Sequence, residues 1–436
     1  MERKTIEGKE NIRDYAVLVG LRSPILHEDS ADEESLGELA ALVETAGGEA
    51  VGTILQSREK PEPHSFIGEG KVEEVRRMVE SENATMVIFD NDLSPSQIRV
   101  LTEMLGVQVL DRSGLILDIF AQRAKTKEGC LQVELAQYQY LLPRLVGMWT
   151  HLERQAGTSG KGPIGSKGPG ETQLETDRRH IHRKIDKLKE ELEEVRRVRA
   201  TQRQRRMKNE IPVVAIVGYT NAGKSTLLNA ITGAGIPANN RLFDTLDTTT
   251  RLLTVSDTLD VVISDTVGFI RKLPHQLVEA FKATLEELEY ADLLLHVIDA
   301  SHPEWRQQAQ IVEKLIRELH ADQIPCIRVY NKSDLAFSGE REKEDDSVAI
   351  SALTGEGIDD LMAAIDRKLD KGTRRVTIHL PYDKTGLLDV LYREAKVEKV
   401  DYSETVDVIA VCNPRQLGMM KAYIEGWVEP KEDWER

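Results

Sequence analysis

The sequence predicts a multidomain α/β protein. We expect an N-terminal βα domain with a helical hairpin, a second α/β domain built on a phosphate-binding loop, and a small C-terminal α+β module. Apolar strand-like runs alternate with helical patterns in two regions, a glycine- and lysine-containing loop joins a strand to a helix, and a long apolar repeat at helical spacing lies between the regions. At roughly 100 to 200 residues per domain, a chain of 436 residues allows about two to four domains. The domains are expected at 1–112, 113–210, 211–372 and 373–436.

Composition excludes a membrane-spanning protein and disfavours a secreted one. No apolar stretch approaches the roughly 20 residues that cross a bilayer, and the N-terminus lacks the order of a signal peptide. Cys130, Cys326 and Cys412 are too far apart for a close-spaced metal or redox motif. We therefore expect a cytoplasmic monomer without stable membrane insertion. Its net charge of -16 repels phosphate backbones, so any contact with nucleic acid must be local.

The N-terminal domain is expected to alternate strands and helices around a mostly parallel sheet. The apolar runs at 16–20, 50–55, 86–90 and 107–110 predict its strands. Between them, 35–45 has apolar residues at helical spacing and ends at Gly47 and Gly48. Ser94 and Pro95 open another helix as capping residue and first helical residue.

A helical hairpin is expected next. Helices are predicted at 115–124, at 131–146 and from 172 to about 208, the last with an apolar repeat from Leu174 to Val198. The segment 157–170 holds six glycines and two prolines and cannot form a packed core, so it predicts a mobile tip loop or a surface arm that orders on a partner. The segment 178–208 contains 13 Lys and Arg residues but only 5 Asp and Glu residues. This surplus suits RNA phosphates, although a solvated helix face with internal ion pairs explains it as well.

The strongest functional signal is a phosphate-binding loop. A strand at 213–217 runs into the residues Gly218, Tyr219, Thr220, Asn221, Ala222, Gly223, Lys224 and Ser225, and a helix continues from Thr226. Backbone N–H groups of such a loop point at phosphates, the lysine reaches the β and γ phosphates, and the serine hydroxyl binds Mg²⁺. A chance glycine-rich turn is the weaker reading because strand and helix are both in place.

A second motif reads the base. Asn331, Lys332, Ser333 and Asp334 follow a strand at 326–330. The Asp334 carboxylate can accept two hydrogen bonds from guanine, which adenine cannot supply, so GTP is favoured over ATP. Asn331 is expected to tie this loop to the phosphate loop, and Lys332 to lie along the base and sugar. After a strand at 348–350, the guanine would be backed by Ser351, Ala352 and Leu353.

Two further segments are expected to respond to the γ-phosphate. Asp265, Thr266, Val267 and Gly268 follow an apolar strand at 261–263; Asp265 would hold Mg²⁺ through water, and the Gly268 N–H would sense the γ-phosphate. The threonine-rich segment 243–251 suits a switch loop, and its four threonines compete for the Mg²⁺ shell. The order of these elements predicts a P-loop GTPase domain at 211–372, with strict βα alternation.

The sequence lacks one side chain that is expected for GTP hydrolysis. The residue after the glycine of this motif is a water-orienting glutamine in Ras-like enzymes, whereas here Phe269 and Ile270 follow Gly268. We expect a partner, a backbone group or a bound cation to complete the site. Asn221 suggests K⁺, because several GTPases with asparagine at this place hold K⁺ near the phosphates, and a structural loop asparagine is the alternative.

Elsewhere the sequence predicts structure rather than chemistry. The C-terminal module reads as a strand at 376–380, a helix at 384–395, strands at 397–401 and 406–412, and a helix at 414–423. His296 is expected in a strand next to the core.

The chain resembles the HflX family of ribosome-associated GTPases over about residues 16–369. The likeness extends beyond the nucleotide motifs to 68–74, 110–120, 131–137 and 168–179. The family's first switch corresponds to Phe243, Asp244, Thr245, Leu246 and Asp247, and by this resemblance Thr245 is the Mg²⁺-binding threonine. Thr248 stands where the family usually has proline. We therefore expect Lys224, Thr245 and Gly268 to be catalytic and Ser225, Thr245 and Asp265 to hold Mg²⁺.

The resemblance implies binding to the large ribosomal subunit and its rRNA, with the hairpin tip near the peptidyl-transferase region, and splitting of stalled or idle ribosomes under stress. GTP would order the switches, and hydrolysis would release the factor. One alternative is a GTP-regulated RNA-binding factor in large-subunit assembly. An ATP-using RNA remodeller ranks last, because residues 1–110 contain no phosphate loop.

Overall fold

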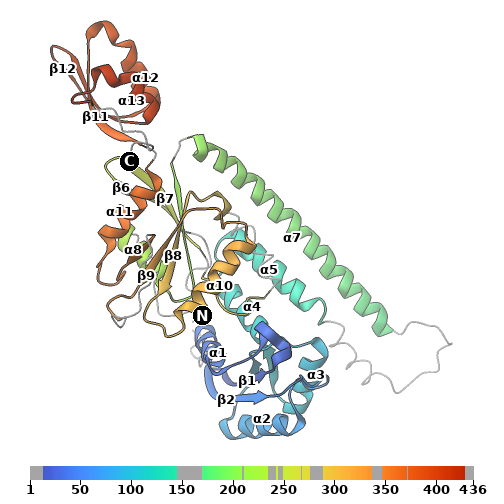
Figure 1. The fold of residues 1–436 in the computed structure, drawn as a ribbon. Coiled ribbons are helices and arrows are strands. Elements are labelled where there is room, and N and C mark those ends of the chain that lie inside the picture. Colours follow the sequence, from blue (N-terminus) through green and yellow to red (C-terminus); the bar gives the residue numbers. More distant parts are fainter. Residues whose placement is uncertain are drawn as a thin grey trace, which may run out of the picture.

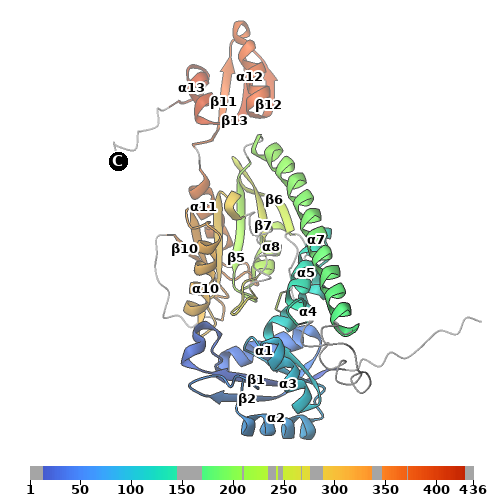
Figure 2. The ribbon, with the colours of Figure 1, turned by 90° about the vertical axis from the view of Figure 1, so that its right-hand side faces the viewer.

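A computed structural model describes residues 13–144, 169–208, 211–233, 242–243, 249–266, 268–274, 288–335, 346–370 and 372–427. These residues form three β-sheets and a long helical hairpin (Figure 1). The N-terminal domain and the C-terminal module lie at opposite ends, with the largest sheet between them, as the perpendicular view in Figure 2 also shows. The multidomain α/β fold class is confirmed, while the four domain boundaries stay predictions.

The N-terminal domain is a parallel four-stranded sheet in the order β2-β1-β3-β4. Buried apolar residues alternate between its faces, so α1 covers one face and α2 and α3 cover the other. Weak apolar content explains why the sequence did not single out α2, which buries only Val72, Val75 and Val79. Its elements are β1 (Tyr15–Arg22), a 3-10 helix (Pro24–Asp29), α1 (Glu33–Ala46), β2 (Glu49–Ser57), α2 (Glu69–Glu82), β3 (Met86–Phe89), α3 (Pro95–Leu105) and β4 (Gln108–Asp111).

The helical hairpin is present. Helices α4 (Arg112–Arg123) and α5 (Lys127–Leu141) are followed by α7 (Pro169–Lys208), which packs along α5. The hairpin seam, defined as Leu131 and Leu135 of α5 with Ile185, Leu188 and Leu192 of α7, is buried. Val198, predicted to continue this seam, is 51% exposed, because the contact does not extend to that end of α7. Most of the glycine-rich segment lies outside the described residues, although Pro169 and Gly170 begin α7.

The central sheet has six strands in the order β10-β9-β8-β5-β7-β6. Strict βα alternation was wrong here, because β6 pairs with β7 antiparallel through a tight turn. The last residues of the predicted switch segment, from Thr249 on, therefore belong to an edge strand. The elements are β5 (Val213–Gly218), α8 (Lys224–Thr232), β6 (Thr249–Ser256), β7 (Leu259–Asp265), β8 (Leu293–Asp299), α10 (Trp305–Glu318), β9 (Cys326–Asn331), β10 (Ser347–Ala349) and α11 (Ile358–Leu369).

The C-terminal module folds in the predicted order around an antiparallel sheet with β13 in the centre. Its own apolar cluster, which includes Ile378, Leu391 and Met420, is separate from the other clusters. The elements are β11 (Arg374–Leu380), α12 (Gly386–Glu394), β12 (Lys396–Tyr402), β13 (Val406–Cys412) and α13 (Pro414–Met420), with 3-10 turns at Tyr382–Lys384 and Lys421–Tyr423.

The N-terminal and central domains share one core. A single cluster of buried side chains joins α1 and α4 to the central sheet, and the rings of Phe120 and Phe243 meet edge to face at 4.6 Å between centroids. Within the described ranges, no helix is long and apolar enough to cross a membrane. The three cysteines, all in described parts, form no disulfide.

Candidate nucleotide site

The phosphate loop joins β5 to α8 at the carboxyl edge of the central sheet. Gly223 has φ +93°, and a Cβ there would lie 2.2 Å from Nδ2 of Asn331, so only glycine fits between the two loops. Asn221 also adopts a left-handed conformation, with φ +61°. The loop ends where Lys224 begins α8, so backbone N–H groups of the first helical turn are available to an anion.

Lys224 is held inside the loop that precedes it. Its side chain is buried, and Nζ donates a hydrogen bond to the Tyr219 carbonyl oxygen at 2.8 Å. Burial lowers the pKa of Lys224 to about 8, although nearby Asp265 favours the charged form. A phosphate would stabilise the ammonium form further.

Two predicted magnesium ligands lie together. The Ser225 hydroxyl donates to Oδ2 of Asp265 at 2.9 Å, which brings α8 and the end of β7 into contact. A hydroxyl beside a carboxylate is the oxygen set that Mg²⁺ prefers. Thr266 is also buried, and its hydroxyl donates to the Ile216 carbonyl at 2.7 Å.

The predicted switch residues Asp244, Thr245, Leu246 and Asp247 lie outside the described residues, as does Val267. Phe243 is described, and its ring is buried against Phe120 of the N-terminal domain. That ring is therefore part of the interdomain core, which leaves only the backbone of Phe243 for a nucleotide.

The segment after Gly268 runs beside the phosphate loop. The Thr220 N–H donates to the Phe269 carbonyl at 2.7 Å, and the Phe269 N–H donates to the Gly218 carbonyl at 3.1 Å. A Cβ on Gly268 would lie 2.9 Å from Nζ of Lys224. Phe269 and Ile270 are buried in the core, so neither side chain faces an attacking water.

The base-reading loop is tied to the phosphate loop through Asn331. Its Nδ2 donates to the Ala222 carbonyl at 2.8 Å, and its Oδ1 accepts from the Ala352 N–H at 2.9 Å. This side chain thus joins three of the predicted loops. Lys332 pairs with Asp299 at 2.6 Å.

The other residues that are predicted to bind the base differ in their exposure to solvent. Asp334 is exposed, which leaves its carboxylate accessible to a base. The Ser333 N–H donates to the Ile350 carbonyl at 3.0 Å, which fixes this loop on the sheet. Ser351 and Ala352 are buried, and Leu353 is 81% exposed.

Sequence reasoning missed the contacts that the N-terminal domain makes with this site. The Tyr219 hydroxyl donates to Oε1 of Glu38 at 2.5 Å and accepts from the Arg271 N–H at 2.9 Å. Lys272 forms an ion pair with Asp90. The sequence signal for these contacts is Arg112, which lies in the segment 110–120 and pairs with Glu38 and Asp90.

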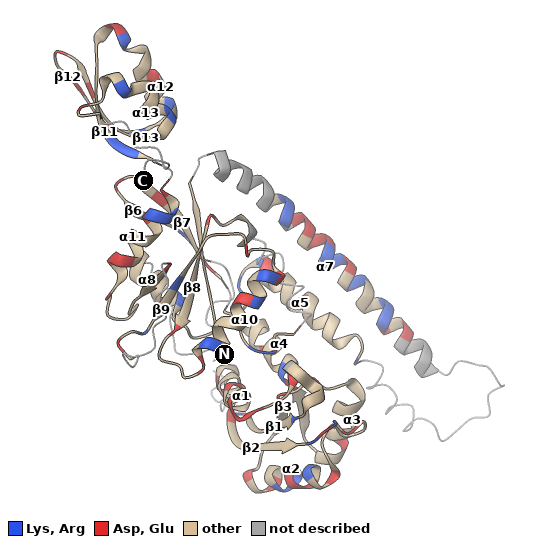
Figure 3. Ribbon diagram, viewed as in Figure 1, with Lys and Arg blue, Asp and Glu red and all other residues tan. Residues whose placement is uncertain are grey.

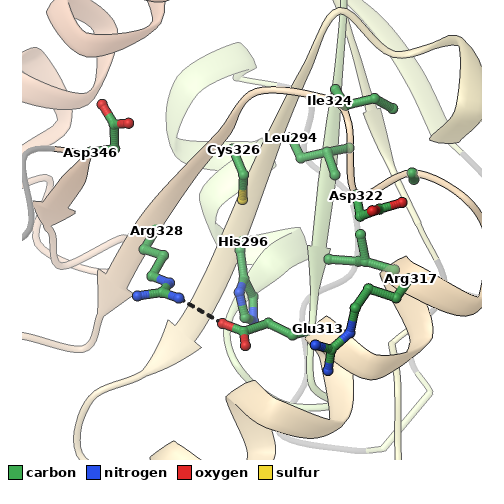
Figure 4. Close-up of a pocket in the computed structure, with 11 residues that line it drawn as sticks. Leu294, His296, Glu313, Arg317, Asp322, Ile324, Cys326, Arg328 and Asp346 are labelled. Atoms are coloured by element: carbon green, nitrogen blue, oxygen red, sulfur yellow. Dashed lines mark hydrogen bonds and ion pairs between the residues drawn. The ribbon is translucent and has the colours of Figure 1, made fainter.

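A separate cavity of about 360 Å³ lies between α10 and the starts of β8 and β9 (Figure 4). His296 lines it and is buried in β8, as predicted; burial lowers its pKa to about 3, so the imidazole is neutral. Glu313 and Arg328 form an ion pair at 2.9 Å across the same cavity. Among the described residues, no group of three or more His, Cys, Asp or Glu side chains could hold a metal ion.

A phosphate loop, a hydroxyl-carboxylate pair for a divalent cation and a guanine-type base loop converge on one edge of a mixed sheet. These features define a P-loop GTPase. Family models agree: "GTP-binding GTPase N-terminal" matches 33–121, "GTP-binding GTPase Middle Region" 123–206, "50S ribosome-binding GTPase" 213–332 and "HflX C-terminal domain" 336–412. The chain belongs to the HflX family of GTPases.

Curated relatives support this membership. The GTPase HflX of Caldanaerobacter subterraneus subsp. tengcongensis is 49% identical over 90% of this chain and 89% of that protein. The GTPase HflX of Escherichia coli K12 is 47% identical over 84% of this chain and 87% of its own length. A solved GTP-binding protein from Sulfolobus solfataricus in complex with GDP aligns at a TM-score of 0.43 and 26% identity, over 81% of this chain and 98% of that one.

Proposed function

We propose that this GTPase binds the large ribosomal subunit and promotes splitting or rescue of stalled or idle ribosomes under stress. The observation that carries the proposal is the match of 213–332 to a 50S ribosome-binding GTPase model. In this scheme GTP orders the switch segments, and hydrolysis releases the factor. The proposal places a monomer in the cytoplasm, in line with the three unpaired cysteines.

We infer that GTP occupies the edge where the loops converge. Lys224 would neutralise charge on the β and γ phosphates, and the Gly268 N–H would contact the γ-phosphate. Asp334 would read the guanine base, with the loop 351–353 behind it. Lys224 and Gly268 lie against the phosphate loop, and Asn331 links that loop to Ala352 of the loop 351–353.

Mg²⁺ would be held by Ser225, Asp265 and Thr245, of which the first two are already in contact. When bound, it would neutralise charge that develops on the transferred phosphoryl group. The chain's own residues position the nucleotide: Lys224 through its ammonium group, and Gly268 through its backbone N–H.

K⁺ is a further candidate at the phosphate loop. Since Phe269 is buried and cannot orient water, a cation near Asn221 is one way to complete the site. GTPase rates in matched potassium and sodium buffers test this idea. Equal rates would leave Asn221 with a structural loop role.

Helix α7 supports the RNA-binding part of the proposal. It extends along the outside of the molecule, and Lys and Arg alternate with Asp and Glu along its described part (Figure 3). Some cations are paired on the helix itself, as in Arg179–Glu175 at 2.7 Å and Lys187–Glu191 at 3.6 Å. The ionic-strength dependence of ribosome binding distinguishes a surface that neutralises phosphates from one that is only solvated.

The decisive experiment measures GTPase rate with and without purified ribosomal subunits, and follows subunit separation on a density gradient with GTP, a non-hydrolysable analogue or GDP. Stimulation by the large subunit and separation with GTP are expected. Lys224→Ala should abolish both, whereas deletion of 157–170 should spare nucleotide binding and impair ribosomal action. Binding to precursor large subunits without separation would favour the assembly role.

A further inference from the structure

A closed ring of polar contacts joins the N-terminal domain to the nucleotide site. Tyr219 donates to Glu38 at 2.5 Å, and the other Glu38 oxygen pairs with Arg112. Arg112 binds Asp90 at 2.7 Å, and Asp90 pairs with Lys272. Arg271 precedes Lys272 in the sequence, and its backbone N–H donates to the Tyr219 hydroxyl at 2.9 Å, which closes the ring. We call these six residues the interdomain ring.

The charged side chains that face one another in the interdomain ring are buried and paired. The side chains of Arg112 and Asp90 are 1% and 0% exposed, and that of Lys272 is 11% exposed. Arg112 and Lys272 face the carboxylates of Glu38 and Asp90, so each of these charges has an opposite partner. Arg271 contributes only its backbone N–H to the ring, and its side chain pairs with Glu34. Removing one partner would leave an uncompensated buried charge. The arrangement with all ion pairs formed is therefore strongly preferred over arrangements in which one pair is broken.

Protonation states in the ring are well defined. Burial opposes ionisation of Asp90, but Arg112 and Lys272 outweigh it and hold the pKa of Asp90 below its usual range. Burial, followed by the Glu38 charge, raises the pKa of Tyr219 far above its usual range. The phenol therefore remains a hydrogen-bond donor to Glu38.

The ring touches both parts of the site that handle the terminal phosphate. Tyr219 belongs to the phosphate loop, and its carbonyl accepts from Nζ of Lys224. Arg271 and Lys272 follow Gly268 on the segment that runs beside that loop. Glu38, Asp90 and Arg112 are anchored in the N-terminal domain, where Arg112 also donates to the Ser35 carbonyl at 3.2 Å.

We propose that Tyr219 and Glu38 are positioning residues for the GTPase site, through which the N-terminal domain holds the segment after Gly268 against the phosphate loop. Holding this segment leaves less of it to be ordered when the Gly268 N–H contacts the γ-phosphate, and this favours binding of GTP. GDP has no γ-phosphate and gains little from this order. The ring thereby sets the preference for GTP over GDP.

The test uses the full chain and compares dissociation constants for GDP and a non-hydrolysable GTP analogue, both with Mg²⁺. Tyr219→Phe keeps the buried ring of the side chain and removes only the hydroxyl. We expect this variant and Glu38→Gln each to weaken binding of the GTP analogue by about 5- to 20-fold and binding of GDP by less than about 2-fold. Tyr382→Phe, which removes a hydroxyl bonded to the Ser403 carbonyl in the C-terminal module, is the matched control.

The double variant Tyr219→Phe/Glu38→Gln shows whether the two residues act together. We expect it to lose little more affinity for the GTP analogue than Glu38→Gln alone, because both substitutions weaken the same Tyr219–Glu38 hydrogen bond, and Glu38→Gln already removes the charge that faces Arg112. Equal losses for GDP and the analogue, or multiplying effects in the double variant, would overturn this inference alone. The inference rests on the proposed nucleotide placement; failure of the unaltered chain to bind GDP would overturn both.

Discussion

Asn331 shows how one side chain can hold a nucleotide site together. Its amide group donates to the carbonyl of Ala222 in the phosphate loop and accepts from the N–H of Ala352, at 2.8 and 2.9 Å. The contact is close enough that Gly223 opposite it must lack a side chain. Three loops that are far apart in sequence therefore have fixed positions before any ligand binds.

We predict that Asn331→Ala lowers affinity for guanine nucleotides by about tenfold or more and the free energy of unfolding by about 2 kcal/mol, because two buried backbone groups lose their partner. Calorimetric titration with GDP and chemical denaturation measure the two effects. Asn413→Ala, which removes the cap of α13, should cost about 1 kcal/mol and leave GDP affinity unchanged. An unaltered affinity in Asn331→Ala would contradict the role of this tie.

Lys224 makes nucleotide binding depend on pH. Because burial lowers its pKa to about 8, the free protein loses this proton as pH rises through 8, whereas phosphates favour the charged form. We predict that GDP affinity falls above about pH 8 and that binding at about pH 9 takes up a proton. Titration in buffers of different ionisation enthalpy measures the uptake. Identical binding enthalpies in all of them would refute it.

At the scale of elements, the hairpin seam decides how α7 is held. Leu131 and Leu135 face Ile185, Leu188 and Leu192, all nearly inaccessible to water. Outside this seam α7 carries mostly charged and polar residues, so apolar contact with α5 is the main force that fixes its direction.

We predict that Leu188→Ala destabilises the hairpin by about 2–4 kcal/mol and lowers affinity for the large ribosomal subunit, because a cavity opens in the seam. Thermal unfolding and sedimentation with subunits measure both. Val198→Ala on the same helix should change stability by less than about 0.5 kcal/mol, since Val198 is 51% exposed. Equal effects of the two substitutions would show that the seam does not hold α7.

Elements and motifs with local signatures could be predicted from the sequence. The strands of the N-terminal sheet, the caps at Ser94 and Gly47, and the phosphate loop each rely on neighbouring residues. The sequence predicts a switch loop where β6 begins, because β-branched threonines suit a polar loop as well as an edge strand. The interdomain ring could not be predicted, since its six members come from five separate segments and only folding brings them together.

For the whole molecule, the boundary between the N-terminal and central domains carries both a shared apolar core and buried charges. Asp29 lies at this boundary, with one oxygen 4.0 Å from Nζ of Lys272. Burial raises its pKa to about 7; Lys272 opposes the shift, and Asp92 and Asp90 add to it. The carboxyl group is therefore partly protonated near neutral pH.

This raised pKa predicts a sign for the pH dependence of stability. The stability that Asp29 contributes is complete below its ordinary pKa of 3.8 and is lost as pH rises through about 7, because the folded state binds the proton more tightly than the unfolded state. Asp29→Asn should therefore be more stabilising, relative to the unaltered chain, at about pH 8 than at about pH 6. Denaturant unfolding at both values measures this, with Asp383→Asn as the control for loss of one negative charge. The opposite order would contradict the assignment.

Helix α7 has 40 residues and ends at Lys208, shortly before β5 begins at Val213. At 1.5 Å per residue it is a rod about 60 Å long, with a pivot at its C-terminal end, before the strand β5 that leads into the phosphate loop. A tilt of about 5° at that pivot would displace the opposite tip by about 5 Å. A small movement at the start of β5 would therefore be enlarged at the distant end of α7, and a force applied at that end would act on β5 through the same long lever arm.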